Sequence, residues 1–208
     1  MKRGAFITFE GTEGAGKSTH LRLLAAHLRD AGHHVHELRE PGGTELGEKI
    51  RHLLKHDSAG KTMTPESELL LMNASRAQLV REIIRPALAA GKVVLCDRFC
   101  DSTTAYQGHG RGLPLNLVEA TIAGAVGDTL PDLTLLLHVS TQVSENRRSR
   151  RADSDRFEEA GPDFFRRVEE GFAQIAEKNP GRVRWIEADR PVETVQSEIR
   201  RLVAQLLN

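Results

Sequence analysis

The sequence predicts an α/β fold in which a parallel five-stranded sheet is flanked by helices. Short apolar runs alternate along the chain with stretches of helical periodicity, an order typical of a parallel sheet. One run, "KVVLC", is continuous and β-branched, as expected for a strand that is buried on both faces. A glycine-rich turn, "GTEGAGKS", also joins the first apolar run to the first helical stretch. Ligands of such folds bind at the carboxyl ends of the strands.

The amino-terminal elements follow in that order. "GAFITFE" predicts the first strand, and residues 17–30 predict a helix whose leucines and alanine recur at i, i+3, i+4 and i+7. "HVHELR" is a weaker second strand, and the spacing of Leu46, Ile50 and Leu54 predicts a short helix after it. A long helical pattern then covers residues 66–90. We expect Pro86 to kink this helix or to mark a boundary in it.

Three further strands complete the predicted sheet. They are "KVVLC", "DLTLLLHV" and "VRWIEA", and a helix is expected after each of the last two. We find no internal repeat and no low-complexity linker, so residues 1–208 are expected to form a single domain.

Composition narrows the class of protein. Lys plus Arg and Asp plus Glu both number 29, so no overall charge points to nucleic acid or to a membrane surface. The apolar start of the chain breaks at Glu10, too early for a signal peptide, and no run approaches the length of a membrane-spanning helix. We therefore expect a cytoplasmic protein in which Cys96 and Cys100 stay reduced and without chemistry.

The turn after the first strand carries the strongest motif. Gly11, Gly16, Lys17 and Ser18 match G-x-x-x-x-G-K-S, with a predicted strand before it and a helix after it. Glycines let backbone N–H groups approach phosphate oxygens, and the helix N-terminus favours negative charge. Lys17 is expected to reach the β- and γ-phosphates and Ser18 to hold Mg²⁺. The predicted ATP-binding residues are Gly11, Thr12, Glu13, Gly14, Ala15, Gly16, Lys17, Ser18 and Thr19.

A nucleoside triphosphate site leaves several functions open. The N-K-x-D stretch that specifies guanine in GTPases is missing from the sequence, and a motor ATPase would usually be a longer chain. A second polar cluster follows the third strand, where Asp97 occupies the position of a carboxylate near Mg²⁺ and Arg98 suits a second anion. These features favour a kinase that acts on a small molecule.

Beyond these motifs the chain resembles bacterial thymidylate kinases over nearly its whole length. The matching stretches are "FEGTEGAGKST", "REPGGTELGEKIR", "ELLLMNASRAQ", "CDRFCDSTTAYQGHGRG" and "DRFEE". The resemblance implies a three-layer P-loop kinase fold with an arginine-rich lid. It implies Mg²⁺-dependent transfer of the ATP γ-phosphoryl group to dTMP, giving dTDP for dTTP and DNA synthesis. It also implies a homodimer, to which the helix predicted over residues 66–90 would contribute.

The resemblance also implies a dTMP site. Arg98 would bind the dTMP phosphate with help from Arg51, Arg76 would bond the thymine edge, and Gln107 would face the base. Tyr106 would crowd the 2′ position of the sugar. The residues that the resemblance implies for dTMP are Glu13, Arg51, Met72, Arg76, Arg98, Ser102, Tyr106 and Gln107.

Three positions around this site depart from related sequences or bear on the charge of the loop. Met72 lies where many family members have a phenylalanine that stacks on thymine, so Leu69 or another neighbour is an alternative platform. The resemblance implies that Glu13 lies near the 3′-hydroxyl of dTMP and close to Mg²⁺. The predicted metal site is therefore Ser18, Glu13 and Asp97. Gly14 replaces an arginine that some relatives carry.

The lid is predicted over residues 145–161. Between Arg147 and Arg156 it holds five arginines and two aspartates, a local charge of +3. Phosphoryl transfer needs positive charge on the moving group, and a lid excludes water. Arg150, Arg151 and Arg156 are therefore predicted to be catalytic, together with Lys17 and Arg98. A solvated surface and a weak nucleic-acid patch are alternative interpretations, but no aromatic platform or basic stripe supports the patch.

Two rival functions remain at this stage. Another nucleoside monophosphate kinase or a deoxynucleoside kinase of the same fold would differ only in its acceptor. A P-loop regulatory ATPase would hydrolyse ATP without any nucleotide acceptor.

Overall fold

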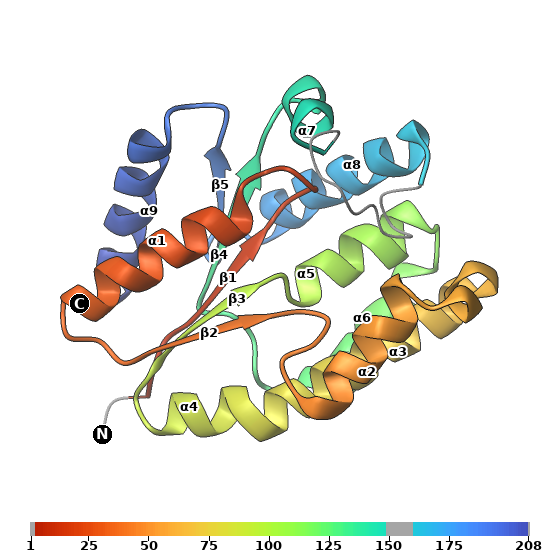
Figure 1. Cartoon of the computed structure of the whole chain (residues 1–208), viewed down its shortest axis with the longest axis horizontal. Helices are drawn as coiled ribbons and strands as arrows, with labels where there is room; N and C mark the ends of the chain where they lie inside the picture. Colours follow the sequence, from red (N-terminus) through yellow and green to blue (C-terminus); the bar gives the residue numbers. More distant parts are fainter. Residues whose placement is uncertain (1–2, 149–159, 208) are drawn as a thin grey trace.

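The computed structural model describes residues 3–148 and 160–207 and has a three-layer α/β/α arrangement (Figure 1). All strand pairs are parallel, and the order across the sheet is β2-β3-β1-β4-β5. The five strands are β1 Phe6–Glu10, β2 Val35–Arg39, β3 Val93–Asp97, β4 Leu133–His138 and β5 Val183–Glu187. The predicted parallel sheet of five strands is therefore confirmed.

Helices cover both faces of the sheet. Helices α1 and α9 pack side by side on one face, over inward side chains such as Ile7, Leu95 and Leu135 (Figure 1). The other helices are α2 Glu45–Lys55, α3 Pro65–Leu79, α4 Arg85–Ala89, α5 Cys100–Thr103, α6 Leu115–Val126, α7 Thr141–Arg148 and α8 Pro162–Lys178; α1 is Lys17–Asp30 and α9 is Val192–Leu207. Of these, α3, α4, α6 and α8 bury apolar side chains against the opposite face.

The long helical pattern predicted over residues 66–90 is a single path with an irregular turn. A π-helical turn, η2 (Val80–Ile84), separates α3 from α4, and Pro86 lies in the first turn of α4. Proline has no N–H to donate and its ring clashes with the preceding turn of a regular helix. The boundary expected at Pro86 is therefore confirmed.

The segment after β3 is short and tightly anchored. Helix α5 continues directly into a second π-helical turn, η3 (Thr104–Gly110), which packs extensively against α8. Phe164 and Phe172 of α8 enclose the ring of Tyr106 edge-on, at centroid distances of 5.9 and 6.2 Å. One helix was predicted between the fourth and fifth strands, whereas the described residues form two there, α7 and α8, and α8 fixes the position of Tyr106.

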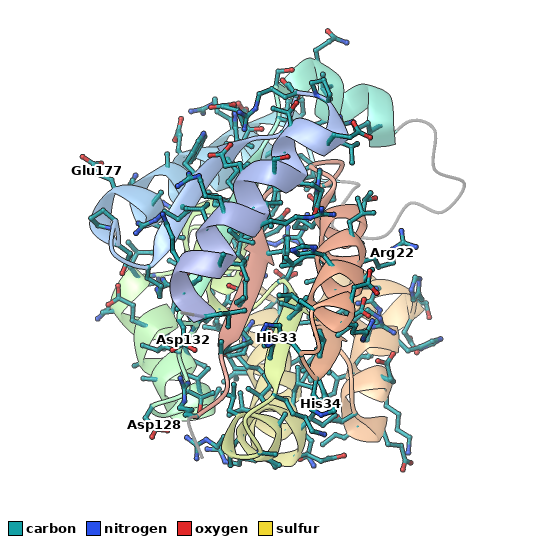
Figure 2. All side chains as sticks on the ribbon, turned by 90° about the vertical axis from the view of Figure 1, so that its left-hand side faces the viewer. Arg22, His33, His34, Asp128, Asp132 and Glu177 are labelled. Atoms are coloured by element: carbon teal, nitrogen blue, oxygen red, sulfur yellow. The ribbon has the colours of Figure 1, made fainter. Side chains whose placement is uncertain are left out.

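The histidines before β2 lie far from the glycine-rich loop. The histidines of the turn between α1 and β2 lie at the foot of α1, where Figure 2 labels His33 and His34. That end is opposite to the glycine-rich loop, from which α1 starts.

None of the described helices is long and apolar enough to cross a membrane.

Candidate active site

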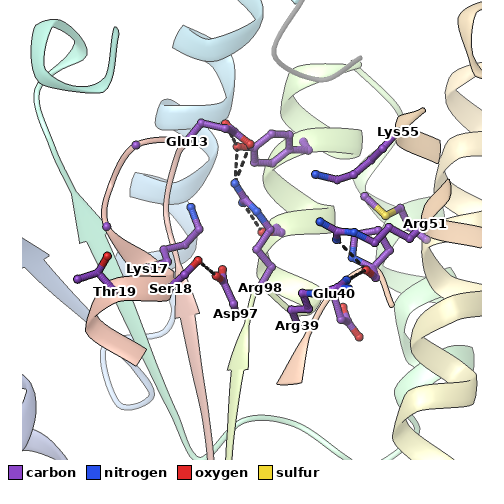
Figure 3. Close-up of a pocket in the computed structure, with 16 residues that line it drawn as sticks. Glu13, Lys17, Ser18, Thr19, Arg39, Glu40, Arg51, Lys55, Asp97 and Arg98 are labelled. Carbon is purple, nitrogen blue, oxygen red and sulfur yellow. Dashed lines mark hydrogen bonds and ion pairs between the residues drawn. The ribbon is translucent and has the colours of Figure 1, made fainter. Parts of the chain in front are cut away.

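A cavity of about 240 Å³ opens at the carboxyl ends of β1, β2 and β3 (Figure 3). This is the edge at which parallel sheets bind ligands. Its walls come from the glycine-rich loop, the ends of β2 and β3, and helices α2, α3 and α5. The residues that line it are Glu13, Gly14, Gly16, Lys17, Ser18, Thr19, Arg39, Glu40, Pro41, Arg51, Lys55, Met72, Asp97, Arg98, Ser102 and Tyr106.

The backbone of the loop requires glycine at two positions. Gly11 has φ +128°, and a Cβ there would lie 2.2 Å from the carbonyl oxygen of Leu137. Gly14 has φ +79°, and a Cβ there would lie 3.0 Å from the carbonyl oxygen of Ser144. The second constraint arises because α7 packs on the loop: Ser144 Oγ donates to the Glu13 carbonyl at 2.7 Å and Arg147 Nη1 donates to the Gly14 carbonyl at 2.9 Å. A side chain at position 14 would be strained by the positive φ, and α7 would have to shift by a few tenths of an ångström to admit its Cβ.

Lys17 lies within the curve of this loop. Its side chain is buried, and Nζ donates to the carbonyl oxygens of Gly11 at 3.0 Å and Thr12 at 2.8 Å. Burial and the neighbouring Arg98 lower the pKa of Lys17 to about 8, against the opposing effect of nearby carboxylates. The ammonium group is therefore a poorly solvated cation, which gains most from an approaching phosphate.

Ser18 and Asp97 bring two oxygen ligands together. The Ser18 hydroxyl donates to Asp97 Oδ2, which joins the start of α1 to the end of β3. Mg²⁺ prefers oxygen ligands and is usually held by one or two carboxylates together with substrate phosphates. In the described part of the chain, His, Cys, Asp and Glu side chains form no cluster of three or more. The Ser18–Asp97 pair therefore fits a Mg²⁺ ion that takes its remaining ligands from phosphate and water.

Arg98 stands at the centre of the cavity. Its backbone has φ +70°, a rare conformation for a side chain of this size. Its Nη1 donates to the Gly11 carbonyl at 3.1 Å and to Ser102 Oγ at 2.9 Å, and its Nη2 donates to Glu13 Oε1 at 2.7 Å and to the Tyr106 hydroxyl at 3.2 Å. The guanidinium also lies 5.0 Å from the centroid of the Tyr106 ring.

Glu13 belongs to this cluster, and its carboxylate accepts hydrogen bonds from two side chains. Beside the bond from Arg98, its Oε2 accepts from the Tyr106 hydroxyl at 2.6 Å. Burial raises the pKa of Glu13, but Arg98, Lys17 and the Tyr106 hydroxyl outweigh burial and leave it below its ordinary value. Glu13 is thus an anion held between a cation and a phenol. The predicted place of Glu13 in the metal site stays a prediction, because both of its carboxylate oxygens face Arg98 and Tyr106.

The structure brings some of the predicted acceptor residues to the cavity and leaves others behind its wall. Arg51, Met72 and Ser102 line it with Glu13, Arg98 and Tyr106. Arg76 is only 2% exposed and does not line it. Gln107 is fully buried as well, and donates to Glu68 Oε1 at 2.8 Å.

Arg76 is saturated by protein partners. It pairs with Glu40 at 2.7 Å and donates to Asn73, Thr103 and the Phe99 carbonyl at 2.9 to 3.0 Å. For Arg76 to contact a base directly, it would have to exchange some of these bonds for bonds to the base. Its implied contact with the thymine edge, like that of Gln107, therefore stays a prediction.

Three charged cavity residues were not predicted. Arg39 is the last residue of β2 and Glu40 follows it, at the same sheet edge as the glycine-rich loop. The rule that ligands bind at the carboxyl ends of strands could have found both. Lys55 lies one helical turn after Arg51 on α2, and Figure 3 shows both side chains reaching from α2 toward Arg98. The i, i+4 spacing places Lys55 on the face of Arg51 and was the available signal.

The predicted lid is only partly described. Arg147 lies in α7 and contacts the glycine-rich loop, whereas Arg150, Arg151 and Arg156 lie outside the described residues. Their catalytic role therefore stays a prediction.

A phosphate loop that shares one cavity with a second, arginine-centred anion site is the arrangement of a P-loop kinase acting on a nucleotide. The comparisons agree with this class and narrow it. A model described as Thymidylate kinase matches residues 9–199. The chain therefore belongs to the thymidylate kinase family.

Individual relatives cover the whole length. The chain is 49% identical to the thymidylate kinase of Pseudomonas fluorescens (strain Pf0-1), over 98% of this chain and 97% of the relative. It is 46% identical to that of Deinococcus radiodurans, over 99% and 98%. The crystal structure of thymidylate kinase from Ehrlichia chaffeensis superposes with a TM-score of 0.79 at 35% identity, covering 97% of this chain and 99% of that chain. The family resemblance and the P-loop kinase fold predicted from the sequence are confirmed.

Proposed function

We propose that this enzyme transfers the γ-phosphoryl group of ATP to dTMP, giving ADP and dTDP, in the cytoplasmic supply of dTTP. The observation that carries the proposal is the placement of Arg98. Its guanidinium bonds at once to the phosphate loop, through the Gly11 carbonyl, and to the acceptor wall, through Ser102 and Tyr106. A phosphate bound at Arg98 therefore lies next to a triphosphate bound at Lys17.

The reaction needs positioning and positive charge. An oxygen of the dTMP phosphate attacks the γ-phosphorus in line, forming the new P–O bond as the bond to the ADP oxygen breaks. A phosphate monoester is already an anion at neutral pH, so no general base is required. Lys17 and Arg98 neutralise the phosphates from opposite sides, and we assign the remaining charge to Arg150, Arg151 and Arg156 of the lid. Ser18 and Asp97 would hold Mg²⁺, which when bound offsets charge on the ATP phosphates.

The acceptor is tested by measuring ADP formation from ATP with dTMP, dUMP, UMP, AMP, GMP or thymidine. We expect dTMP to be best. dUMP should also react, because it lacks only one methyl group and a pocket distinguishes one methyl group by about 1–3 kcal/mol. UMP should react poorly, since Tyr106, which lines the cavity, is proposed to crowd the 2′ position of the sugar. Another preferred acceptor would favour a different nucleotide kinase, and acceptor-independent hydrolysis would favour a regulatory ATPase.

Glu13 is proposed to serve the acceptor more than the donor. In the Glu13→Gln variant, we expect the KM for dTMP to rise about tenfold and the KM for ATP to change less than threefold. The reason is that an amide replaces the anion that Arg98 and Tyr106 both bond, so Arg98 loses its charged partner at 2.7 Å. Initial rates with each substrate varied in turn measure both constants. A larger effect on ATP would place Glu13 at the triphosphate instead.

We also propose that the chain forms a homodimer through α2, α3 and α6. Leu46, Leu70 and Leu117 are exposed at 49, 60 and 44%, one on each of these three helices, which pack against each other in the order α2, α3, α6. Light scattering after gel filtration should give twice the chain mass of 23.0 kDa. The Leu70→Asp variant should shift toward the monomer. A monomeric wild-type protein at micromolar concentration would contradict the proposal.

A further inference from the structure

Glu10 is a fully buried carboxylate at the end of β1, directly before the phosphate loop. It does not line the cavity. Its Oε1 accepts from the backbone N–H groups of Phe99 at 2.7 Å and Ser102 at 3.3 Å, and its Oε2 bonds to Ser102 Oγ at 2.5 Å. One carboxylate from β1 therefore holds both the backbone at the start of α5 and the hydroxyl that α5 presents to the cavity.

The direction of the hydrogen bonds at Ser102 follows from chemistry when Glu10 is ionised, as it mostly is above a pKa of about 7. Arg98 Nη1 can only donate, so Ser102 Oγ accepts from it at 2.9 Å. The single proton of the hydroxyl is then available for the Glu10 carboxylate, which can only accept when it is ionised. The chain of bonds runs from the Arg98 guanidinium to the Ser102 hydroxyl and on to Glu10.

We propose that Glu10 is a positioning residue for the acceptor phosphate, which aims the Arg98 guanidinium through Ser102. The inference rests on the proposed function, because Arg98 is there assigned to the dTMP phosphate. Arg98 needs such support, since its backbone has φ +70°, and conformations of this kind persist only where the surroundings hold them. Glu10 supplies this support to Nη1 through Ser102, while Glu13 and Tyr106 both bond to Nη2.

A purely structural role explains Glu10 poorly. Burial and the neighbouring Asp101 raise the pKa of Glu10 to about 7, although Ser102, Arg98 and the Phe99 amide favour the ionised form. This folded-state pKa exceeds the ordinary value of 4.5 for a glutamate, so the contribution of Glu10 to folding stability is lost as the pH rises through about 7. Above that pH, a neutral side chain of the same shape should be at least as favourable for folding.

Helix α5 also has a second, separate anchor. Asp101 is paired with Arg182 through two bonds of 2.7 and 2.9 Å, and it accepts from Thr134 Oγ1 at 3.1 Å. Asp101 is buried on the same helix as Ser102, but none of its bonds reaches Ser102 or Arg98. It provides a matched control, a buried carboxylate that fixes α5 without bonding to Glu10, Ser102 or Arg98. Its charge acts on Glu10 by raising the pKa, so the control is measured at pH 8, where Glu10 is mostly ionised.

The test is a double-mutant cycle with Glu10→Gln, Ser102→Ala and the double variant. Kinetics with each substrate varied, calorimetric titration of dTMP and ATP, and thermal unfolding at pH 8 are the measurements. We expect either single variant to raise the KM and Kd for dTMP about tenfold and to leave those for ATP within twofold. The double variant should have the same KM for dTMP as the single variants, because each substitution alone already breaks the Glu10–Ser102 hydrogen bond. Ser102→Thr, which keeps the hydroxyl, should restore the KM for dTMP to within threefold of wild type.

Two outcomes would overturn the inference. If the single effects multiply to about a hundredfold in the double variant, Glu10 and Ser102 act independently. If Asp101→Asn raises the KM for dTMP as much as Glu10→Gln does, the carboxylate serves only to hold α5. If Glu10→Gln does not fold, Glu10→Asp replaces it, because the shorter side chain withdraws the carboxylate from Ser102. This variant must likewise raise the KM for dTMP more than the KM for ATP. A wild-type enzyme inactive on dTMP would instead refute the proposed function.

Discussion

The Lys17→Met variant should lose phosphoryl transfer by on the order of a thousandfold while it folds normally. Lys17 is the cation enclosed by the phosphate loop, with Nζ held at the Gly11 and Thr12 carbonyls. Methionine fills a similar volume but leaves the transferring phosphate without this charge. Because burial already lowers the pKa of Lys17 to about 8, its removal should cost the fold little. Coupled-assay kcat and thermal unfolding measure the two effects.

Lys92→Met is the matched control. Lys92 is partly buried near the other end of the sheet, just before β3, and its Nζ bonds to His36 Nε2 at 3.0 Å. The Lys92→Met variant also loses one positive charge, but Lys92 does not line the cavity. Its kcat should therefore stay within twofold of wild type. A Lys17→Met enzyme with near-normal kcat would remove Lys17 from the catalytic role, and a loss shared by both variants would point to a general effect of charge.

Local sequence patterns predicted the framework well, because each element carries its own signal. Helix α1 has the predicted bounds of residues 17–30 around its apolar period, and β3 (Val93–Asp97) contains most of the predicted continuous apolar run. The glycine-rich loop was identifiable for the same reason, since a local motif specifies its backbone. Where neighbours in sequence are also neighbours in space, a sequence motif is sufficient to predict the local structure.

Partners distant in sequence decide the rest of the site. The contact of Arg76 with the base is implied by the resemblance and stays a prediction. Its ion pair with Glu40 and its bond to the Phe99 carbonyl depend on the meeting of three separate segments. Glu10 looked like the polar end of a strand, yet its partner Ser102 is 92 residues away. Neither contact leaves a period or spacing in the sequence, so burial and bonding of these side chains required the structure.

The second large effect is expected from Arg98→Lys. This change keeps the positive charge, but a single ammonium group cannot span the four acceptors that the guanidinium reaches from two nitrogens. We expect kcat/KM for dTMP to fall at least about a hundredfold, equivalent to about 2.7 kcal/mol of transition-state stabilisation. The KM for ATP should change less than threefold, because the phosphate loop retains Lys17. Initial rates over both substrates measure the two quantities.

Arg81→Lys separates this effect from the general cost of replacing arginine. Arg81 lies in the π-helical turn η2 and donates to the carbonyl oxygens of Ala77 and Ala125 at 3.1 and 2.7 Å, outside the cavity. Its replacement should lower the unfolding temperature slightly and leave kcat/KM unchanged. If Arg98→Lys instead kept its kcat/KM for dTMP, charge alone would be enough at this position. The forked hydrogen bonding to Ser102 and Glu13 would then be a feature of the fold and not of the acceptor site.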